Sequence, residues 1–254
     1  MPQSLTLDVR SEMVNLLAGI NDLPLVVNTG DGIKTKVPLN EWLMPGPNRL
    51  TVKLGRPLGQ WFQPGRASVT ASIQARPGPD AAPPARLPSF SWPMPNRAET
   101  YPFVFSSPPF QAAAPSTKLW QESEVIAELT LADRQAILAL TLSLSGAMGE
   151  RNLFQVMDLL KYRTAELALA YGSDLDADVA KSREFFSSVF GSEGFAMRPI
   201  DQHHVQFTIV GNRHLVWVTQ GETGNIVATV RLPRFRYSLP VLVAKIRGAW
   251  LIAR

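Results

Sequence analysis

The arrangement of apolar and polar residues changes twice along the chain. Over residues 4–76, apolar side chains recur at every second position in short segments, as at Leu50, Val52 and Leu54. From about residue 116 to residue 191 they recur every three or four positions, and after residue 195 the spacing of two returns. A period of two is typical of half-buried strands, and a period near 3.6 of amphipathic helices. The pattern therefore predicts strands, then helices, then strands.

Turn residues separate the strands expected in the first part of the chain. The pairs Asn21-Asp22 and Asp31-Gly32 favour tight turns, and a Pro-Gly-Pro-Asn segment ends at Asn48. Several short strands at this spacing predict an antiparallel β-sandwich over residues 1–115.

Prolines mark the end of this first part. Of the 21 prolines, 18 lie at or before Pro115 and none lies between residues 116 and 198. Because Pro interrupts helix interiors and central strands, we expect the helices in the proline-free residues 116–198. We therefore expect a second domain over residues 116–254. Residues 77–98 hold seven prolines, so we expect no regular element there. This segment either recognises a groove in a partner or is a strap held to the protein's own surface by Phe90 and Trp92, and we favour the strap.

Residues 119–191 are predicted to hold three helices. A capping box formed by Thr130 and Asp133 marks the start of the first helix. Ser173 is a candidate cap for the third helix. The glycines expected to end the three helices are, in chain order, Gly146 or Gly149, then Gly172, then Gly191.

Residues 196–254 are predicted to form an antiparallel sheet, beginning with a hairpin at Gly211-Asn212. The second domain is then α+β, with three helices packed on a curved antiparallel sheet. On the first strand His204 shares a face with Gln206 and Thr208, and we expect that face to lie toward solvent.

The final residues, AKIRGAWLIAR, together with the preceding helices and strands, resemble the nuclear-transport-factor-two-like superfamily. Arg247-Gly248 is similar to the charged turn before the last strand of that cone-shaped α+β fold, and Trp250 and Ile252 to its inward face. The resemblance implies a last strand that lies centrally in the sheet. The chain differs from familiar members because no strand is predicted between residues 130 and 190. The superfamily contains isomerases, dehydratases and binding modules, so its fold does not define a function.

Residues 37–54 resemble part of the sugar-binding jelly-roll modules and glycosidase accessory domains, through the Pro-Gly-Pro-Asn turn and the alternating strand after it. Many sandwiches need this turn chemistry. The resemblance therefore implies a sandwich fold but not a sugar ligand.

Composition excludes several kinds of site. The chain has no Cys and three His, which rules out thiol chemistry and leaves few metal ligands, so we expect no metal and no cofactor. The N-terminus lacks the features of an export signal. Apolar runs such as VLVA are far shorter than the roughly 20 residues that span a bilayer. We expect a cytoplasmic protein that does not bind membranes.

Charge is distributed unevenly over the second domain. Residues 116–200 carry 8 Lys or Arg against 12 Asp or Glu, and residues 201–254 carry 7 against 2. Arginines beside aromatic residues are common at protein interfaces. We expect a protein partner with an acidic surface, bound at the basic sheet or in a crevice between the domains. The candidate partner-binding residues are His204, Arg213, Arg234, Phe235, Arg236 and Tyr237.

Two other interpretations of these arginines remain open. They could pair with the acidic helices or protect an edge of the sheet from aggregation. They could also contact nucleic acid, but three arginines neutralise few phosphates and no nucleic-acid-binding motif accompanies them, so we do not expect that partner.

No motif of an enzyme family is present. We therefore expect a non-enzymatic interaction or accessory protein, such as an immunity-type protein of a bacterial secretion locus. The alternative is a small-molecule enzyme or ligand-binding protein that uses a cavity between the helices and the sheet of the second domain. Its candidate ligand-binding residues are Asp158, Tyr162, Tyr171 and His214.

Overall fold

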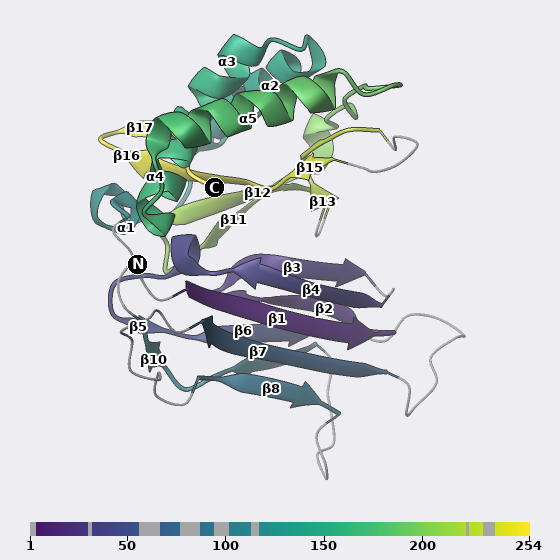
Figure 1. The fold of residues 1–254 in the computed structure, drawn as a ribbon, viewed down its shortest axis with the longest axis vertical. Coiled ribbons are helices and arrows are strands. Elements are labelled where there is room, and N and C mark those ends of the chain that lie inside the picture. The colour runs from purple at the N-terminus through teal and green to yellow at the C-terminus, as the bar shows by residue number, and fades with distance from the viewer. Residues whose placement is uncertain are drawn as a thin grey trace. The chain divides into compact units, whose positions relative to one another are not determined.

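Strands come first, helices second, and strands return at the end of the chain, as the apolar pattern predicts (Figure 1). The structure is a computed structural model. It describes residues 4–29, 32–55, 67–76, 87–93, 102–112, 117–221, 224–230 and 237–254. The chain divides into two compact units, residues 1–115 and residues 116–254.

Unit 1 contains two four-stranded antiparallel sheets. The first has the order β4-β1-β7-β8, with bounds Ile33–Pro38, Ser4–Glu12, Ser68–Arg76 and Ser89–Trp92. The second has the order β3-β2-β6-β9, with bounds Leu23–Thr29, Asn15–Ile20, Leu50–Leu54 and Phe103–Ser106. The described residues of this unit also form a short pair, β5 (Pro47–Asn48) with β10 (Phe110–Gln111), and a 3-10 turn, η1 (Asn40–Trp42).

Aromatic side chains join the two sheets of unit 1. The ring of Phe90 on β8 lies 4.7 Å from that of Phe105 and 6.1 Å from that of Phe103, both on β9. Alternate residues of the inner strands, such as Leu7 and Val52, are fully buried. Burial of alternate residues in both sheets gives the unit its hydrophobic core.

The proline-rich segment contains a regular strand, which corrects the prediction that it could not. Residues 89–92 form β8, which pairs with β7 from Val69↔Trp92 to Ser72↔Ser89. The four residues between Pro88 and Pro93 keep all their N–H groups, so a short ladder can form there. Phe90 and Trp92 are buried, as expected for aromatic residues that hold a strap to the protein itself.

The predicted turn residues of unit 1 are structural. Asn21 and Asp22 both have positive φ in the turn between β2 and β3, as a tight hairpin requires. The side chain of Asn48, which is fully buried, accepts hydrogen bonds from the Met44 N–H at 2.9 Å and the Asn21 amide at 2.8 Å. It also donates to the carbonyls of Met44 and Gly46. The Asp31-Gly32 turn lies partly outside the described residues.

Unit 2 contains five helices among its described residues, where the sequence predicted three. They are α1 (Leu119–Glu122), α2 (Leu131–Gly149), α3 (Leu153–Leu159), α4 (Lys161–Tyr171) and α5 (Leu175–Phe190). After the 3-10 turn η2 (Gln202–His204) come the strands β11 (Val205–Val210), β12 (Leu215–Gln220), β13 (Gly224–Asn225), β14 (Val227–Ala228), β15 (Ser238–Leu239), β16 (Val241–Ile246) and β17 (Ala249–Ile252).

Most of the predicted helix ends are confirmed. Thr130 and Asp133 form the capping box of α2, and Gly172 ends α4 in a left-handed conformation with φ 62. The second predicted helix is instead divided at Leu160, where the backbone turns out of the helical region between α3 and α4. The cap of α5 is Asp174 and not Ser173, because the Asp174 side chain accepts from the Ala177 N–H at 2.8 Å.

Helices α2, α3 and α5 lie over one face of the antiparallel sheet β11-β12-β16-β17 (Figure 1). One hydrophobic cluster joins the two layers: it includes Ile137 and Val156 from the helices and Val216 and Val243 from the strands. Trp250 on β17 donates from its indole N–H to the Asp133 carboxylate at 3.0 Å, which ties the last strand to the start of α2.

The last strand lies at the edge of its sheet, so the prediction of a central position is wrong. Among the described strands β17 pairs only with β16, by a two-residue turn at Arg247-Gly248. Ile252 is nevertheless buried, because α2 packs against β17. Cover by a helix lets an edge strand be apolar.

Candidate functional site

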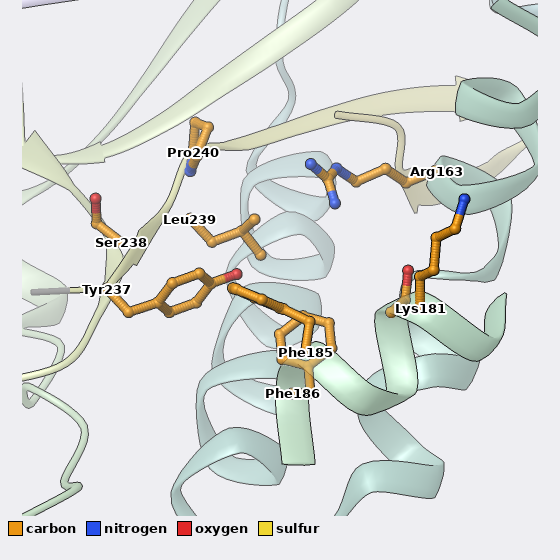
Figure 2. A pocket seen from close by; sticks show the side chains of 9 residues that line it. Arg163, Lys181, Phe185, Phe186, Tyr237, Ser238, Leu239 and Pro240 are labelled. Carbon is orange, nitrogen blue, oxygen red and sulfur yellow. The ribbon is translucent and has the colours of Figure 1, made fainter. Parts of the chain in front are cut away.

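A pocket of about 450 Å³ opens in unit 2 beside α4, α5 and β15 (Figure 2). Arg163 comes from α4, and four lining side chains come from two successive turns of α5. The rest of the wall is the short segment that leads through β15 toward β16. The described lining residues are Arg163, Lys181, Ser182, Phe185, Phe186, Tyr237, Ser238, Leu239 and Pro240.

Two cations are among the described lining residues, and they differ in how they are compensated. The Lys181 ammonium lies 3.4 Å from the Asp178 carboxylate, one turn earlier on α5. The Nε of Arg163 is buried and has no hydrogen-bond partner in the described part of the chain. An unpartnered buried donor is costly, and more so on a charged group. Arg163 is therefore the group in this pocket that most needs an acceptor.

Three aromatic rings form one wall of the pocket. Phe185 and Phe186 are neighbours on α5, and the ring of Tyr237 lies 5.5 Å from the first and 6.2 Å from the second. Consecutive helical residues point about 100° apart, so the two rings lie in different surroundings. Phe186 is buried in the core of unit 2, whereas Phe185 is 49% exposed. Figure 2 shows the Phe185 and Tyr237 rings beside each other.

The Tyr237 hydroxyl can donate a hydrogen bond at neutral pH. Burial raises its pKa above the ordinary value of 10, and the positive charge of Arg163 opposes part of this rise. The phenol thus keeps its proton. Arg163, Lys181 and Ser182 are further donor groups among the described lining residues.

The four residues predicted to bind a ligand do not line this pocket. Asp158, at the end of α3, is 57% exposed at its side chain and pairs with Lys161 at 2.8 Å. Tyr171 ends α4 and is 37% exposed. Tyr162 and Tyr171 are nine residues apart, which places them on opposite sides of α4. The set is therefore not brought together at one place on this helix.

His214 instead contacts the segment around α1, and Tyr162 lies close enough to be influenced by the charge of Glu122 in that helix. The Tyr162 hydroxyl is buried without a described partner, and burial, then Glu166 and Glu122, raises its pKa while Arg254 lowers it. His214 is partly buried near a turn, with its Nδ1 2.9 Å from the Ser123 hydroxyl. Its ring meets Trp120 edge-on at 6.2 Å. These contacts hold residues 117–126 onto unit 2.

The predicted partner-binding residues that the structure describes lie in three different places. Arg213 has a positive φ in the hairpin turn, and its Nε donates to the Ile126 carbonyl at 3.0 Å. His204 is exposed, with its Nδ1 2.7 Å from the Asp201 carboxylate, whose pKa is lowered mainly by this hydrogen bond. Tyr237 lines the pocket. Arg234, Phe235 and Arg236 lie outside the described residues.

The solvent-facing side of β11 is as predicted. Gln206 and Thr208 are exposed, as is His204 in the turn before the strand, while Val205, Phe207 and Ile209 pack against the core. His203 and His204 belong to η2 and not to the strand itself.

The sequence interpretation missed Arg163, Lys181, Ser182 and Phe185. A signal was present in the segment KSREFF: Lys181, Ser182 and Phe185 are spaced so as to share one helix face. Two adjacent phenylalanines cannot both face one core from a helix, so one of them had to face outward. Arg163 and Tyr237 lie far apart along the chain, and no sequence signal indicated that they line the same pocket.

A second pocket, of about 350 Å³, lies in unit 1. It is lined by proline, aromatic and serine side chains, and no charged residue is among those described. Its described lining residues are Leu87, Pro88, Ser89, Phe105, Ser107, Pro108, Pro109 and Phe110. The pocket in unit 2 offers more specific chemistry because charged donors and aromatic rings meet there.

Within the described ranges, no group of three or more His, Asp or Glu side chains is placed to hold a metal ion. No described helix combines the length and the apolar character needed to cross a membrane. Comparison with models of protein families, with curated proteins and with solved structures finds no match to this chain.

Proposed function

We propose that this protein is a non-enzymatic binding protein whose unit 2 holds a small organic anion in the pocket beside α4 and α5. The observation that carries the proposal is the Arg163 guanidinium, which lines the pocket and has no ion pair or hydrogen bond within the described chain. A carboxylate or a similar oxyanion would pair with the guanidinium charge and accept from its N–H groups.

The lining favours binding over catalysis. None of the described lining residues is a His, Asp or Glu that could act as a general base. Burial keeps the Tyr237 hydroxyl protonated, and Lys181 is already close to Asp178. The groups that remain are donors and apolar surfaces, which orient a ligand and do not activate it.

A binding assay with matched variants tests this proposal. Titration calorimetry with phenylacetate, hexanoate and inorganic phosphate should detect at least one organic anion, with an affinity that falls as salt is raised. Arg163→Gln should weaken binding about tenfold or more, because a charge-assisted pair is lost. Lys161→Gln removes an exposed cation two residues away and should leave binding unchanged. A dissociation constant of about 1 mM is weak on the usual scale. If no organic anion binds even at 10-fold that concentration, the proposal is refuted.

Docking of a protein partner is the second candidate function. It is favoured by the exposure of Phe185 at the pocket, since aromatic residues beside Arg are common anchors at interfaces. A partner that inserts an acidic side chain beside Phe185 would use the same donors. Under this candidate, peptides with an acidic residue next to an aromatic one should bind, and short organic anions should not.

For the fold, we propose that the two facing sheets of unit 1 form a β-sandwich and that unit 2 is a distant variant of the cone-shaped α+β superfamily. Contact of Phe90 with Phe103 and Phe105 supports the first proposal. The helices over one face of an antiparallel sheet support the second. An experimental structure of unit 2 compared with that superfamily would test it.

A further inference from the structure

We infer that the ligand of this pocket is an aromatic carboxylate, with its ring against Phe185 and Tyr237 and its carboxylate on Arg163. This inference rests on the proposed function and specifies the class of anion. It depends on two observations, the aromatic wall with the exposed Phe185 and the Arg163 cation, which has no described ion pair; they lie on adjoining sides of one pocket (Figure 2).

The aromatic wall favours a ring over an aliphatic chain. Phe185 and Tyr237 already meet at 5.5 Å with their planes inclined by 57°, so the exposed side of Phe185 can take a further ring edge-on. Aromatic pairs prefer such inclined geometries at centroid distances of about 4.5–7 Å. They contribute beyond the burial of area by about 0.5–1.5 kcal/mol, or roughly two- to tenfold in affinity. An aliphatic group of equal size gains only the free energy of burying its apolar area.

The cations favour a carboxylate over a phosphate dianion. Asp178 offsets the charge of Lys181 at 3.4 Å, which leaves Arg163 as the cation without a described ion pair or hydrogen bond. One planar guanidinium matches the two oxygens of one carboxylate. A second negative charge would find no further uncompensated cation among the described lining residues. Tyr237 and Ser182 can donate to the same oxygens without adding charge.

The size of the pocket limits the ligand to one or two rings. Sites for small organic molecules have volumes of about 300–1,000 Å³, and this pocket, at about 450 Å³, lies near the lower end. A single-ring acid with a short linker between ring and carboxylate would reach from Phe185 to Arg163.

Four probes, each with one six-membered ring and one short polar group, test the inference on the full chain. They are phenylacetate, cyclohexylacetate, phenylacetamide and phenyl phosphate, compared by titration calorimetry at one salt concentration. We expect phenylacetate to bind about two- to tenfold more tightly than cyclohexylacetate. We expect it to exceed phenylacetamide by about tenfold or more, because the amide has no charge. Phenyl phosphate should bind no more tightly than phenylacetate.

Variants of the protein show which side chain causes the preference for an aromatic ring. Phe185→Leu should remove the preference for phenylacetate over cyclohexylacetate, while Phe154→Leu, at a residue 82% exposed on α3, should preserve it. Both substitutions are at exposed positions, and an unchanged unfolding temperature would confirm that each variant folds.

The outcomes separate the inference from the function on which it rests. If phenylacetate and cyclohexylacetate bind equally, or phenyl phosphate binds more tightly, the aromatic carboxylate is wrong and an organic anion site remains. If none of the three anions binds, both proposals fail. If the preference survives Phe185→Leu, the ring does not lie against this residue and the inference is overturned.

Discussion

Single polar residues with several partners hold unit 2 together, and Asp133 is the clearest example. Its carboxylate accepts from the Thr130 hydroxyl at 2.7 Å, the Trp250 indole at 3.0 Å and the Lys245 ammonium at 3.2 Å. The Thr130 hydrogen bond lowers its pKa most, followed by those from Trp250 and Lys245, while burial opposes them. The sequence predicted the capping box but could not predict the two partners more than 100 residues away.

Asp133→Asn should destabilise unit 2 by about 2 kcal/mol at pH 7, because hydrogen bonds to a charged acceptor are lost. The folded carboxyl has a pKa below its ordinary value of 3.8, so its contribution is complete above that pH. It declines as pH falls toward the lowered pKa. The difference between wild type and variant in urea unfolding should therefore be smaller at pH 2.5 than at pH 7. Asp176→Asn, in the exposed first turn of α5, serves as the control.

Asn48 has the corresponding role in unit 1. Asn48→Ala should reduce the free energy of unfolding by about 2–4 kcal/mol, because the backbone groups of Met44 and Gly46 lose their hydrogen bonds to this buried side chain. Urea unfolding of unit 1 measures this, with Ser91→Ala on the exposed side of β8 as the control. Equal stability of Asn48→Ala and wild type would contradict the structural role.

At the scale of elements, α1 is too short to be stable alone and depends on α4. The buried Glu166 carboxylate accepts from the N–H groups of Lys118 at 3.1 Å and Leu119 at 2.9 Å, the first donors of the helix. The segment continues to Glu124, whose N–H donates to the Lys245 carbonyl at 2.8 Å. Glu166 thus fixes the start of a segment that extends the sheet.

Glu166→Ala should release this segment. Amide exchange at Leu119 should accelerate by about tenfold or more, because two charge-assisted hydrogen bonds are removed. Glu128→Ala, an exposed residue between α1 and α2, should leave exchange at Leu119 unchanged. Hydrogen exchange followed by NMR gives both rates, and equal rates in Glu166→Ala and wild type would show that the carboxylate does not hold α1.

Local signals predicted elements well where the chemistry was local. Thr130 with Asp133, Gly172, and the Asn21-Asp22 and Arg247-Gly248 turns all lie where the sequence placed them. Errors arose where distant contacts decide. Nothing near Trp250 indicates that its strand is at a sheet edge, and the pairing of β8 with β7 joins residues about twenty positions apart.

The division between α3 and α4 shows a related limit. The apolar stripe continues through Leu160, which is buried, so periodicity alone predicts one helix. The Thr164 hydroxyl donates to the Leu160 carbonyl at 3.1 Å, an interaction that commonly bends helices. This bend places Arg163 at the start of α4 rather than in the middle of a long helix.

At the scale of the molecule, each unit has its own set of secondary structures, and unit 2 has its own core. The hydrophobic cluster that joins its helices and strands contains residues from Ile126 to Ile252 and none from unit 1. The pocket is likewise lined by described residues of unit 2 alone. The proline distribution indicated this division because only proline-free sequence can hold the helices.

Residues 116–254 expressed alone should therefore fold and unfold cooperatively. The reason is that the apolar cluster and the Asp133 and Glu166 hydrogen bonds all lie within this range. Calorimetric unfolding measures cooperativity. The affinity for phenylacetate should remain within about twofold of that of the full chain, a difference below 0.5 kcal/mol, because the described pocket lining belongs to unit 2. Loss of a cooperative transition would show that unit 2 requires unit 1.

The central claim, that Arg163 binds an organic anion, is tested most directly by the NMR signal of its own Nε–H group. On addition of phenylacetate to the full chain, this signal should shift and saturate, and its exchange with water should slow, because a bound carboxylate would pair with the same guanidinium and hold it in place. Phenylacetamide should cause no such change. A signal that stays constant while phenylacetate binds elsewhere, or that responds equally to both compounds, would contradict the claim.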